Sequence, residues 1–251
     1  MNQDKEIQGL NINWNILDKI INLIYPQMCA FCGKLDESYL CENCRKEVEK
    51  LEKLHINKYN LKNTYYNEHI YLFKYEDYIR TKILSYKFRD KSYYYKTFVK
   101  ILLNNKKMCD ILKTYDIIIP VPIHNKRKKE RGYNQTELIA KEIARELKKI
   151  VISNNKLNES SKINIQYLNA LIKNKNTNPQ STLSKKQRIE NAKNVYELRN
   201  TNKIEMLKNK NILIFDDIYT TGSTANECAR VLTKEKPNKI GILTIAKDFL
   251  K

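Results

Sequence analysis

LIFDDIYTTGST, residues 213–224, joins an apolar run to two adjacent acids and then to a glycine among hydroxyl residues. The run NILIFDDI (211–218) predicts a buried strand, and GSTANECARVLTKEK (222–236) predicts the helix that follows it. Asp216 and Asp217 would then lie at the carboxyl end of a strand, where open α/β sheets bind their ligands. The stretch therefore predicts a strand–loop–helix unit with a ligand site at its turn.

The loop after the two acids carries the groups that bind a phosphate. Backbone N–H groups at a helix start, together with the helix dipole, attract anions, and Gly222 lets the backbone approach closely. Hydroxyl donors come from Thr220, Thr221, Ser223 and Thr224. The acids would repel a phosphate unless they face a sugar diol, or a Mg²⁺ that bridges diol and diphosphate. The pattern predicts a phosphoribosyl ligand, with its 5′-phosphate in the loop and its ribose hydroxyls on the acids.

The rest of the C-terminal part alternates between strand and helix patterns. Strands are expected at 69–75, 115–122 and 239–246, with a short one in KINIQYLNALIK (162–173). Helices are expected at 76–90, in YYYKTFVKILLNNK (93–106), and at 134–149, where Asn134 and Glu137 form a capping pair. This alternation predicts an α/β domain over residues 67–251 with a mainly parallel sheet flanked by helices.

A basic segment follows the predicted strand at 115–122. The sequence IIIPVPIHNKRKKERGYNQTE (117–137) gathers cations ahead of Gly132 and a helix start: Lys126, Arg127, Lys128, Lys129 and Arg131. Clustered cations and a helix N-terminus can hold the charge of a diphosphate. A solvated basic loop with no ligand is the alternative.

A third polar segment, NPQSTLSKKQRIENAKNVYEL (178–198), lies between these two predicted sites in the chain. A flexible hood of this kind can cover a ligand and exclude water. Side chains able to reach down from it are Gln180, Ser181, Lys185, Lys186 and Arg188. An amphipathic surface helix is the alternative interpretation.

The N-terminal part carries two closely spaced cysteine pairs. Cys29 and Cys32 form CAFC, and after eight residues Cys41 and Cys44 form CENC. Two such turns can place four thiolates around a zinc ion in tetrahedral geometry, with sulfur–zinc distances of roughly 2.3 Å. Because four cysteine ligands leave no coordination position open for water, the zinc would be structural. Disulfides or a redox pair are the alternatives. With the apolar helical stripe of residues 12–26, the pairs predict a small zinc-ribbon module over residues 1–66.

Charge and hydropathy limit the function classes. Residues 1–68 hold 9 Lys/Arg and 10 Asp/Glu, whereas the remaining residues hold 38 and 18, so the excess charge of +20 lies in the C-terminal part. That field points to a polyanionic ligand. The sequence has no window long and apolar enough for a membrane span and no basic-then-apolar start, so we expect a cytoplasmic protein.

The acid–hydroxyl stretch resembles the 5-phosphoribosyl-1-diphosphate (PRPP) motif of type I phosphoribosyltransferases. The order of paired CxxC, PVP…RGYNQ, NPQ…LSxxQRxEN and DD…TTGST resembles the ComF family of competence proteins. The resemblance implies a type I phosphoribosyltransferase-like domain that follows a zinc ribbon. It also implies a role in natural transformation, the uptake of single-stranded DNA, in which the protein would act beside a competence helicase and DNA-processing proteins. It gives Asp216 and Asp217 the ribose role, Thr220 to Thr224 the 5′-phosphate, and the 126–134 loop the diphosphate.

Different function classes stay open at this point. The first is an enzyme that transfers a phosphoribosyl group, with Mg²⁺, to an unidentified acceptor while pyrophosphate leaves. The second is a single-stranded DNA-binding accessory that uses the fold as a scaffold, with tyrosines such as Tyr93, Tyr94 and Tyr95 for base stacking. The third is a docking adaptor whose near-neutral cysteine module contacts a partner protein.

Overall fold

The computed structural model describes residues 28–36, 38–88, 93–154, 165–175 and 194–249. By its internal contacts the chain divides into two compact units, residues 1–47 and residues 48–251. The sequence analysis placed its boundary between residues 66 and 67. In the structure, strand β1 (His55–Lys58) pairs with β2 (Glu68–Lys74), so the residues just before 67 contribute to the sheet of the larger unit.

The larger unit is built on a six-stranded sheet in the order β1-β2-β8-β7-β3-β4. The other four strands are β3 (Ile117–Pro120), β4 (Gln166–Tyr167), β7 (Asn211–Tyr219) and β8 (Lys239–Lys247). Only β1 runs antiparallel to its neighbour. A separate antiparallel hairpin joins β5 (Leu171–Lys173) to β6 (Tyr196–Leu198). The expected mainly parallel α/β sheet is confirmed.

Four helices that the sequence patterns predicted are present among the described residues, and the helical stripe predicted for residues 12–26 lies outside them. The four are α3 (Asp77–Phe88), α4 (Tyr94–Asn104), α7 (Gln135–Asn154) and α9 (Ser223–Leu232). Further helices are α2 (Glu42–Leu51), α5 (Lys106–Leu112), α6 (Asn125–Arg131) and the 3₁₀ turns η2 (Ile204–Leu207) and η3 (Thr233–Glu235). The side chain of Asn134 accepts from the backbone N–H of Thr136 at the start of α7, as its capping role requires. Glu137 instead contacts Lys128 and Lys141.

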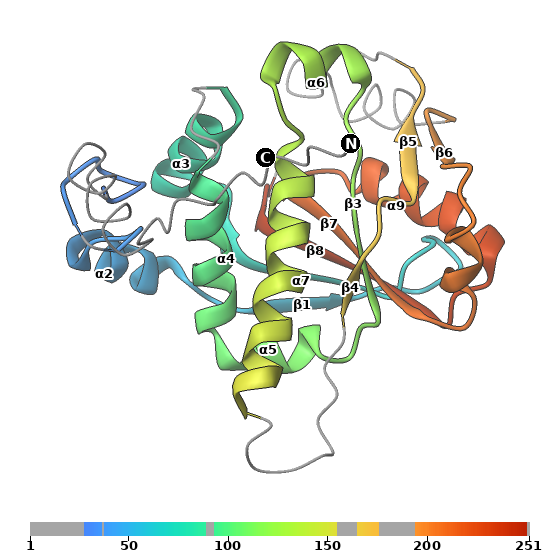
Figure 1. Ribbon diagram of the computed structural model, residues 1–251, viewed down its shortest axis with the longest axis horizontal. Coiled ribbons are helices and arrows are strands. Elements are labelled where there is room, and N and C mark those ends of the chain that lie inside the picture. The colour runs from blue at the N-terminus through green and yellow to red at the C-terminus, as the bar shows by residue number, and fades with distance from the viewer. Residues whose placement is uncertain (1–27, 37, 89–92, 155–164, 176–193, 250–251) are drawn as a thin grey trace, which may run out of the picture. The chain divides into compact units, whose positions relative to one another are not determined.

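The two crossover helices lie on opposite faces of the sheet. From β3 the chain passes through α7 to β4 on one side, and from β7 it passes through α9 to β8 on the other. Because such crossovers are right-handed, helices that lead in opposite directions cover opposite faces. Ile212 and Ile214 share a buried cluster with residues of α9, and the alternate residues Leu213 and Phe215 face the side that α7 crosses in Figure 1.

This topology creates a crevice where β3 and β7 lie side by side. The two strands are parallel neighbours with Pro120 opposite Phe215, and their chain connections leave in opposite directions. Open α/β sheets bind ligands at such a switch point, outside the carboxyl ends of the strands. The predicted acid–hydroxyl loop after β7 and the basic segment after β3 both start there (Figure 1).

The opposite end of the sheet is fastened by a buried carboxylate. Glu68, at the start of β2, contacts Lys58, lies 2.6 Å from Lys239 Nζ and accepts a hydrogen bond from the hydroxyl of Tyr115. Burial alone raises the pKa of Glu68, but the donors from Lys239, Lys58 and Tyr115 outweigh it and lower the pKa from 4.5 to about 2. The ionised form is therefore favoured by folding.

Replacing Glu68 should change the acid stability of the protein. Because the folded pKa lies below the unfolded one, the contribution is present above about pH 4.5 and is lost as the pH falls toward 2. We expect Glu68→Gln to lower the free energy of unfolding at pH 7 by ~2–3 kcal/mol, and the gap to wild type to narrow at pH 3. Urea denaturation at both pH values measures this, with exposed Glu205→Gln as the control. An equal difference in unfolding free energy between wild type and Glu68→Gln at both pH values would contradict the lowered pKa of Glu68.

Candidate functional site

Asp216 and Asp217 lie inside strand β7 rather than after it, since β7 extends to Tyr219. Consecutive strand residues point to opposite faces, so the two carboxylates enter different surroundings although they are neighbours in the chain. The backbone N–H of Asp217 donates to Asp216 Oδ1 at 2.9 Å. The two carboxylates therefore lie on opposite faces of the sheet and do not bind one group together from the same face.

Asp217 is engaged by other parts of the protein. It is buried, with 4% of its surface exposed. Lys87 Nζ, at the end of α3, lies 2.8 Å from Oδ1, and Gln135 Nε2, at the start of α7, donates to Oδ2 at 3.2 Å. Because each carboxylate oxygen has a donor, contacts within the protein offset the cost of burying the Asp217 carboxylate.

Asp216 lies on the side of the phosphate-type loop. It lines a small cavity, here called the loop cavity, together with Ile218, Tyr219, Thr220, Gly222, Ser223, Thr224, Ala225 and Thr244. Burial raises the pKa of Asp216, and the charge of Asp217 raises it further, against the opposing effect of Lys87. Such a carboxyl gains from a ligand that brings hydroxyl donors or positive charge to it.

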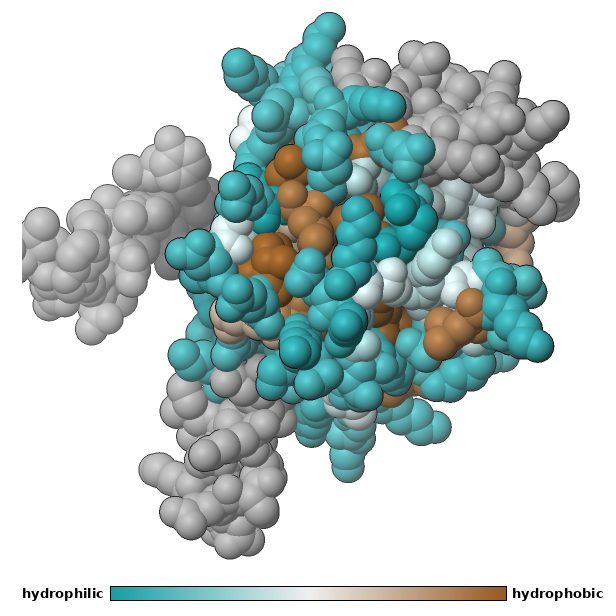
Figure 2. Space-filling view, turned by 90° about the vertical axis from the view of Figure 1, so that its right-hand side faces the viewer, coloured by the Kyte–Doolittle hydropathy of each residue, from teal (hydrophilic) through white to brown (hydrophobic). Residues whose placement is uncertain are grey.

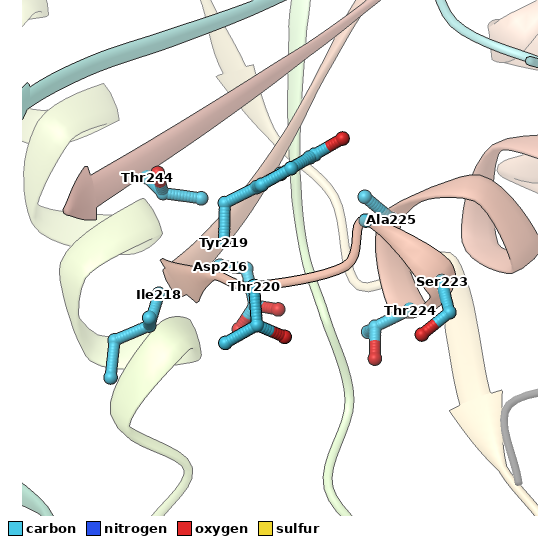
Figure 3. A pocket seen from close by; sticks show the side chains of 9 residues that line it. Asp216, Ile218, Tyr219, Thr220, Ser223, Thr224, Ala225 and Thr244 are labelled. Carbon is cyan, nitrogen blue, oxygen red and sulfur yellow. The ribbon is translucent and has the colours of Figure 1, made fainter. Parts of the chain in front are cut away.

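The loop cavity has the form of an anion cradle. Hydroxyls of Ser223 and Thr224 project from the first turn of α9, on the same side of the loop as the Asp216 carboxyl, while the ring of Tyr219 points away (Figure 3). Thr221 Oγ1 and Ser223 Oγ share a hydrogen bond of 2.8 Å. Backbone N–H groups at the start of α9 add the dipole end of a ten-residue helix.

Gly222 is required at the turn for two reasons. Its φ of 75° lies in the left-handed region, and a Cβ built on it would lie 2.2 Å from the Tyr219 hydroxyl. That hydroxyl shares a 2.6 Å hydrogen bond with the hydroxyl of Tyr66, and the Tyr219 ring stacks on His69 at 4.0 Å. The end of β7 is thus fixed to β2 and its preceding loop, which holds the turn in one place.

The predicted basic loop is a short helix, α6. The His124 side chain accepts from the backbone N–H of Lys126 at its start, and Gly132, with φ of 79°, ends it. None of the residues Asn125–Arg131 is buried. The segment joins β3 beside β7, where the Val121 N–H donates to the Phe215 carbonyl at 2.9 Å. The structure therefore brings the basic segment and the acid–hydroxyl loop to the same edge of the sheet.

Within α6 the cations have different partners. Lys128 Nζ lies 3.2 Å from Glu137, and Arg131 donates to the side chain of Gln135 at 2.5 Å. Arg127 raises the local positive potential enough to lower the pKa of Lys173, although burial is the larger cause of that lowering. The charge of Arg127 therefore acts on Lys173 in the hairpin β5–β6.

The sequence analysis assigned no role to three side chains that the structure places at the site. Gln135 was quoted within RGYNQ, but its bridge to Asp217 crosses 82 positions of sequence. Lys87 gave no signal. Lys173, on β5, lies partly buried over the ring of Tyr196 at 5.5 Å, and the charge of Asp216 acts on its pKa. Only the fold brings these residues to the acids.

The hood prediction lies outside the described residues. Gln180, Ser181, Lys185, Lys186 and Arg188 all belong to residues 176–193. The face that carries β5, β6 and α9 is shown in Figure 2, where hydrophobic side chains are surrounded by hydrophilic ones. The role of these five residues stays a prediction.

The cysteines form a second candidate site, in the N-terminal unit. The sulfur atoms of Cys29, Cys32, Cys41 and Cys44 all lie within 4.8 Å of one another. The Cys32 and Cys41 sulfurs are 3.6 Å apart, close to the roughly 3.8 Å edge of a tetrahedron with metal–sulfur distances of roughly 2.3 Å. The set can hold a structural metal such as zinc.

The two cysteine pairs are held in different ways. After Cys29, Gly33 has φ of 80° and its N–H donates to the Cys29 carbonyl, which closes a tight turn. Cys41 precedes α2 and Cys44 lies in the first turn of that helix, so the second pair is on a helix start and not on a second turn. Burial raises the pKa of Cys29, but backbone donors from Cys41, Cys32 and Phe31 outweigh it and lower the pKa to about 7.

Comparisons with known proteins agree with this geometry. A family model described as a phosphoribosyl transferase domain matches residues 136–248, which include α7 from its second residue onward and the acid–hydroxyl loop. Competence protein F of Haemophilus influenzae is 28% identical over 225 residues, covering 87% of this chain and 84% of the relative. Competence protein ComFC of Bacillus subtilis is 22% identical over 235 residues, covering 90% and 80%.

A solved structure of a hypoxanthine phosphoribosyltransferase from Staphylococcus aureus is also similar, with 12% identity and a TM-score of 0.31. The similarity covers 61% of this chain and 62% of that chain. A likeness at this level adds no argument to the two competence proteins. Among the described residues, no helix is long and apolar enough to cross a membrane.

The ion pair between Lys87 and Asp217 can be tested by a double-mutant cycle. Lys87→Met should cost ~3 kcal/mol of unfolding free energy, because it leaves a buried carboxylate without its cation. Adding Asp217→Asn should cost less in that background than in wild type. Chemical denaturation measures both, with the exposed Lys107→Met as the control. Strictly additive losses would show that the two side chains do not interact.

Proposed function

Because the chain belongs to the ComF family and carries a phosphoribosyltransferase-type domain, we propose that it binds PRPP between the loop after β7 and helix α6. The main support for this proposal is structural. One switch point of the sheet is bordered by Asp216, by the Ser223 and Thr224 hydroxyls, and by the basic helix α6. The loop takes the 5′-phosphate, Asp216 takes the ribose hydroxyls, and α6 takes the diphosphate.

Each end of PRPP has a counterpart of matching chemistry. The start of α9 offers backbone N–H groups and hydroxyls to a phosphate dianion. Lys126, Arg127 and Arg131, with Gly132 after them, offer positive charge to the diphosphate. Between them, Asp216 accepts hydrogen bonds from the ribose diol at the edge of the loop cavity. A ligand lacking any of the three parts would leave one of these groups without a ligand contact.

As a reaction, we propose phosphoribosyl transfer to an acceptor, with pyrophosphate as the leaving group. Mg²⁺ would enter with the diphosphate and ribose oxygens beside Asp216, and it would neutralise charge on the leaving group. The residues of this chain orient the ligand and stabilise the departing charge through α6. Residues 176–193 would cover the ligand through Gln180, Lys185 and Arg188.

We also propose that the metal of the N-terminal unit is zinc. Four thiolates within tetrahedral reach, with Cys29, Cys41 and Cys44 buried, match a closed structural site. Such a site stabilises the fold of a short segment that has few other buried residues. The proposed role is structural support of this unit, and the proposed setting of the whole protein is the cytoplasmic handling of DNA taken up in natural transformation.

Single-stranded DNA binding is a second candidate function. The observation that favours it is α6, whose residues Asn125–Arg131 include five cations and no buried side chain. A basic helix of this kind can follow a phosphate backbone. The run Tyr93–Tyr95 is no stacking platform as a whole, because Tyr94 is buried in the core at 1% exposure.

Isothermal titration with PRPP, with and without Mg²⁺, tests the main proposal. We expect magnesium-enhanced binding, and we expect Asp216→Asn to weaken it by about tenfold or more, because the charged acceptor for the ribose hydroxyls is lost. Asp110→Asn, at an exposed position of α5, is the control. Unchanged PRPP affinity in Asp216→Asn would show that the ligand does not use this acid.

The same variant separates the two candidate functions. Binding of a single-stranded oligonucleotide, measured over a range of salt concentrations, should be equal in wild type and Asp216→Asn, because phosphate contacts are made by α6. A protein that binds the oligonucleotide but never PRPP would favour the scaffold function over the enzyme.

A further inference from the structure

The side-chain amide of Gln135 lies between two charged groups of the site. Arg131 donates to Gln135 Oε1 at 2.5 Å, and Gln135 Nε2 donates to Asp217 Oδ2 at 3.2 Å. Only this orientation of the amide gives the guanidinium an acceptor and the carboxylate a donor. Gln135 is 6% exposed, so water does not compete freely for these contacts.

The backbone around Gln135 is fixed by hydrogen bonds from buried neighbours. The Tyr86 hydroxyl donates to the Gln135 carbonyl at 2.7 Å, and the Tyr133 hydroxyl donates to the Tyr86 carbonyl at 2.6 Å. The Thr136 hydroxyl donates to the Val121 carbonyl at 2.6 Å. These contacts tie the start of α7 to the end of α3 and to the chain leaving β3, so the amide has little room to move.

Arg131 occupies the junction between α6 and α7. It is the last residue of α6, and Gly132 follows it in the left-handed region. A guanidinium has N–H donors on several sides and can hold an amide oxygen and a phosphate oxygen at once. A side chain held in place by one contact also loses less conformational entropy when it binds a ligand by another.

Lys87 and Gln135 together account for both oxygens of Asp217. A carboxylate with a cation on one oxygen and an amide on the other would need to give up one of these partners to accept a sugar hydroxyl. Asp216 accepts one backbone hydrogen bond on Oδ1 and lines the loop cavity, where a ligand hydroxyl can reach its carboxyl. The two acids of the motif therefore have separate tasks.

We propose that Gln135 is a positioning residue: it holds the Arg131 guanidinium toward the diphosphate of the ligand and keeps Asp217 bound within the protein, leaving Asp216 as the acid that meets the ribose. This inference rests on the proposed PRPP site and deepens it. It predicts that the amide matters for the diphosphate end of the ligand and not for the 5′-phosphate end.

Two ligands that differ only in the diphosphate test this division. We expect Gln135→Leu to weaken PRPP binding about tenfold, since Arg131 loses its charged hydrogen bond, and to leave ribose 5-phosphate binding within about twofold. Gln166→Leu, at an exposed position of β4, is the matched control. Equal losses for both ligands would overturn the positioning role and leave Gln135 as a purely structural residue.

Gln135→Glu provides a readout that a structural role would not change. The introduced carboxyl lies against Asp217, which raises its pKa, while Arg131 and the nearby Lys87 act to lower that pKa. In its protonated form it can donate to Asp217 and accept from Arg131 as the amide does. The ratio of variant to wild-type PRPP affinity should therefore rise toward one as the pH falls from 8 to 6. A ratio independent of pH would contradict the bridge. If Gln135→Leu does not fold, Gln135→Glu still tests the positioning role.

The outcomes separate this inference from the function on which it rests. If wild type binds ribose 5-phosphate and PRPP but Gln135→Leu loses both equally, the PRPP site stands and the positioning role fails. If wild type binds neither ligand at millimolar concentration, the proposed function fails and the positioning role fails with it.

Discussion

The contact between β3 and β7 is the constraint on which the rest of the site depends. The parallel pairing of Pro120 with Phe215, continued by the hydrogen bond from Val121, brings two carboxyl ends to one place. Since β3 connects to the strand on one side and β7 to the strand on the other, the two connections diverge at the point where open α/β sheets bind their ligands. Strand β7 and the loop after it supply an acid and hydroxyls, and helix α6 after β3 supplies cations.

Strand geometry decides what two adjacent acids can do. Because neighbouring residues of β7 face opposite sides, one carboxylate must lie on the α7 side and the other on the α9 side. On the α7 side the chain provides a lysine and an amide, and Asp217 becomes a buried link among α3, α7 and β7. On the α9 side Asp216 lines the loop cavity, where burial and the charge of Asp217 raise its pKa.

The sequence predicted the features that depend on local pattern. The mainly parallel α/β sheet, the strand–loop–helix unit around Gly222 and the four-cysteine cluster follow from periodicity, turn residues and spacing. Strands β1 and β6 were not predicted from the sequence. They are only four and three residues long, and pairing with neighbouring strands stabilises them rather than a hydrophobic pattern of their own. The sequence did not predict Lys87 and Gln135 as partners of Asp217. They lie 130 and 82 positions before Asp217 in the chain and contact it only in the folded sheet. The basic segment was assigned as a loop, since a charged stretch without an apolar face gives no helical period; its His124 and Gly132 caps define α6.

The site combines a tightly packed half with a more exposed half. Tyr219 is hydrogen-bonded to Tyr66 and stacked on His69, and Gly222 lies against its ring, so the turn that forms the anion cradle cannot shift without disturbing the core. The cations come from α6, which has no buried residue, and from Lys173 on a three-residue strand. Elements with few buried contacts open at lower free-energy cost than core elements. A ligand with a phosphate at one end and a diphosphate at the other would therefore contact a tightly packed cradle at one end and more exposed cations at the other. The Gln135 bridge limits that adjustment, because it fastens the end of α6 to the acid on the packed side of the sheet.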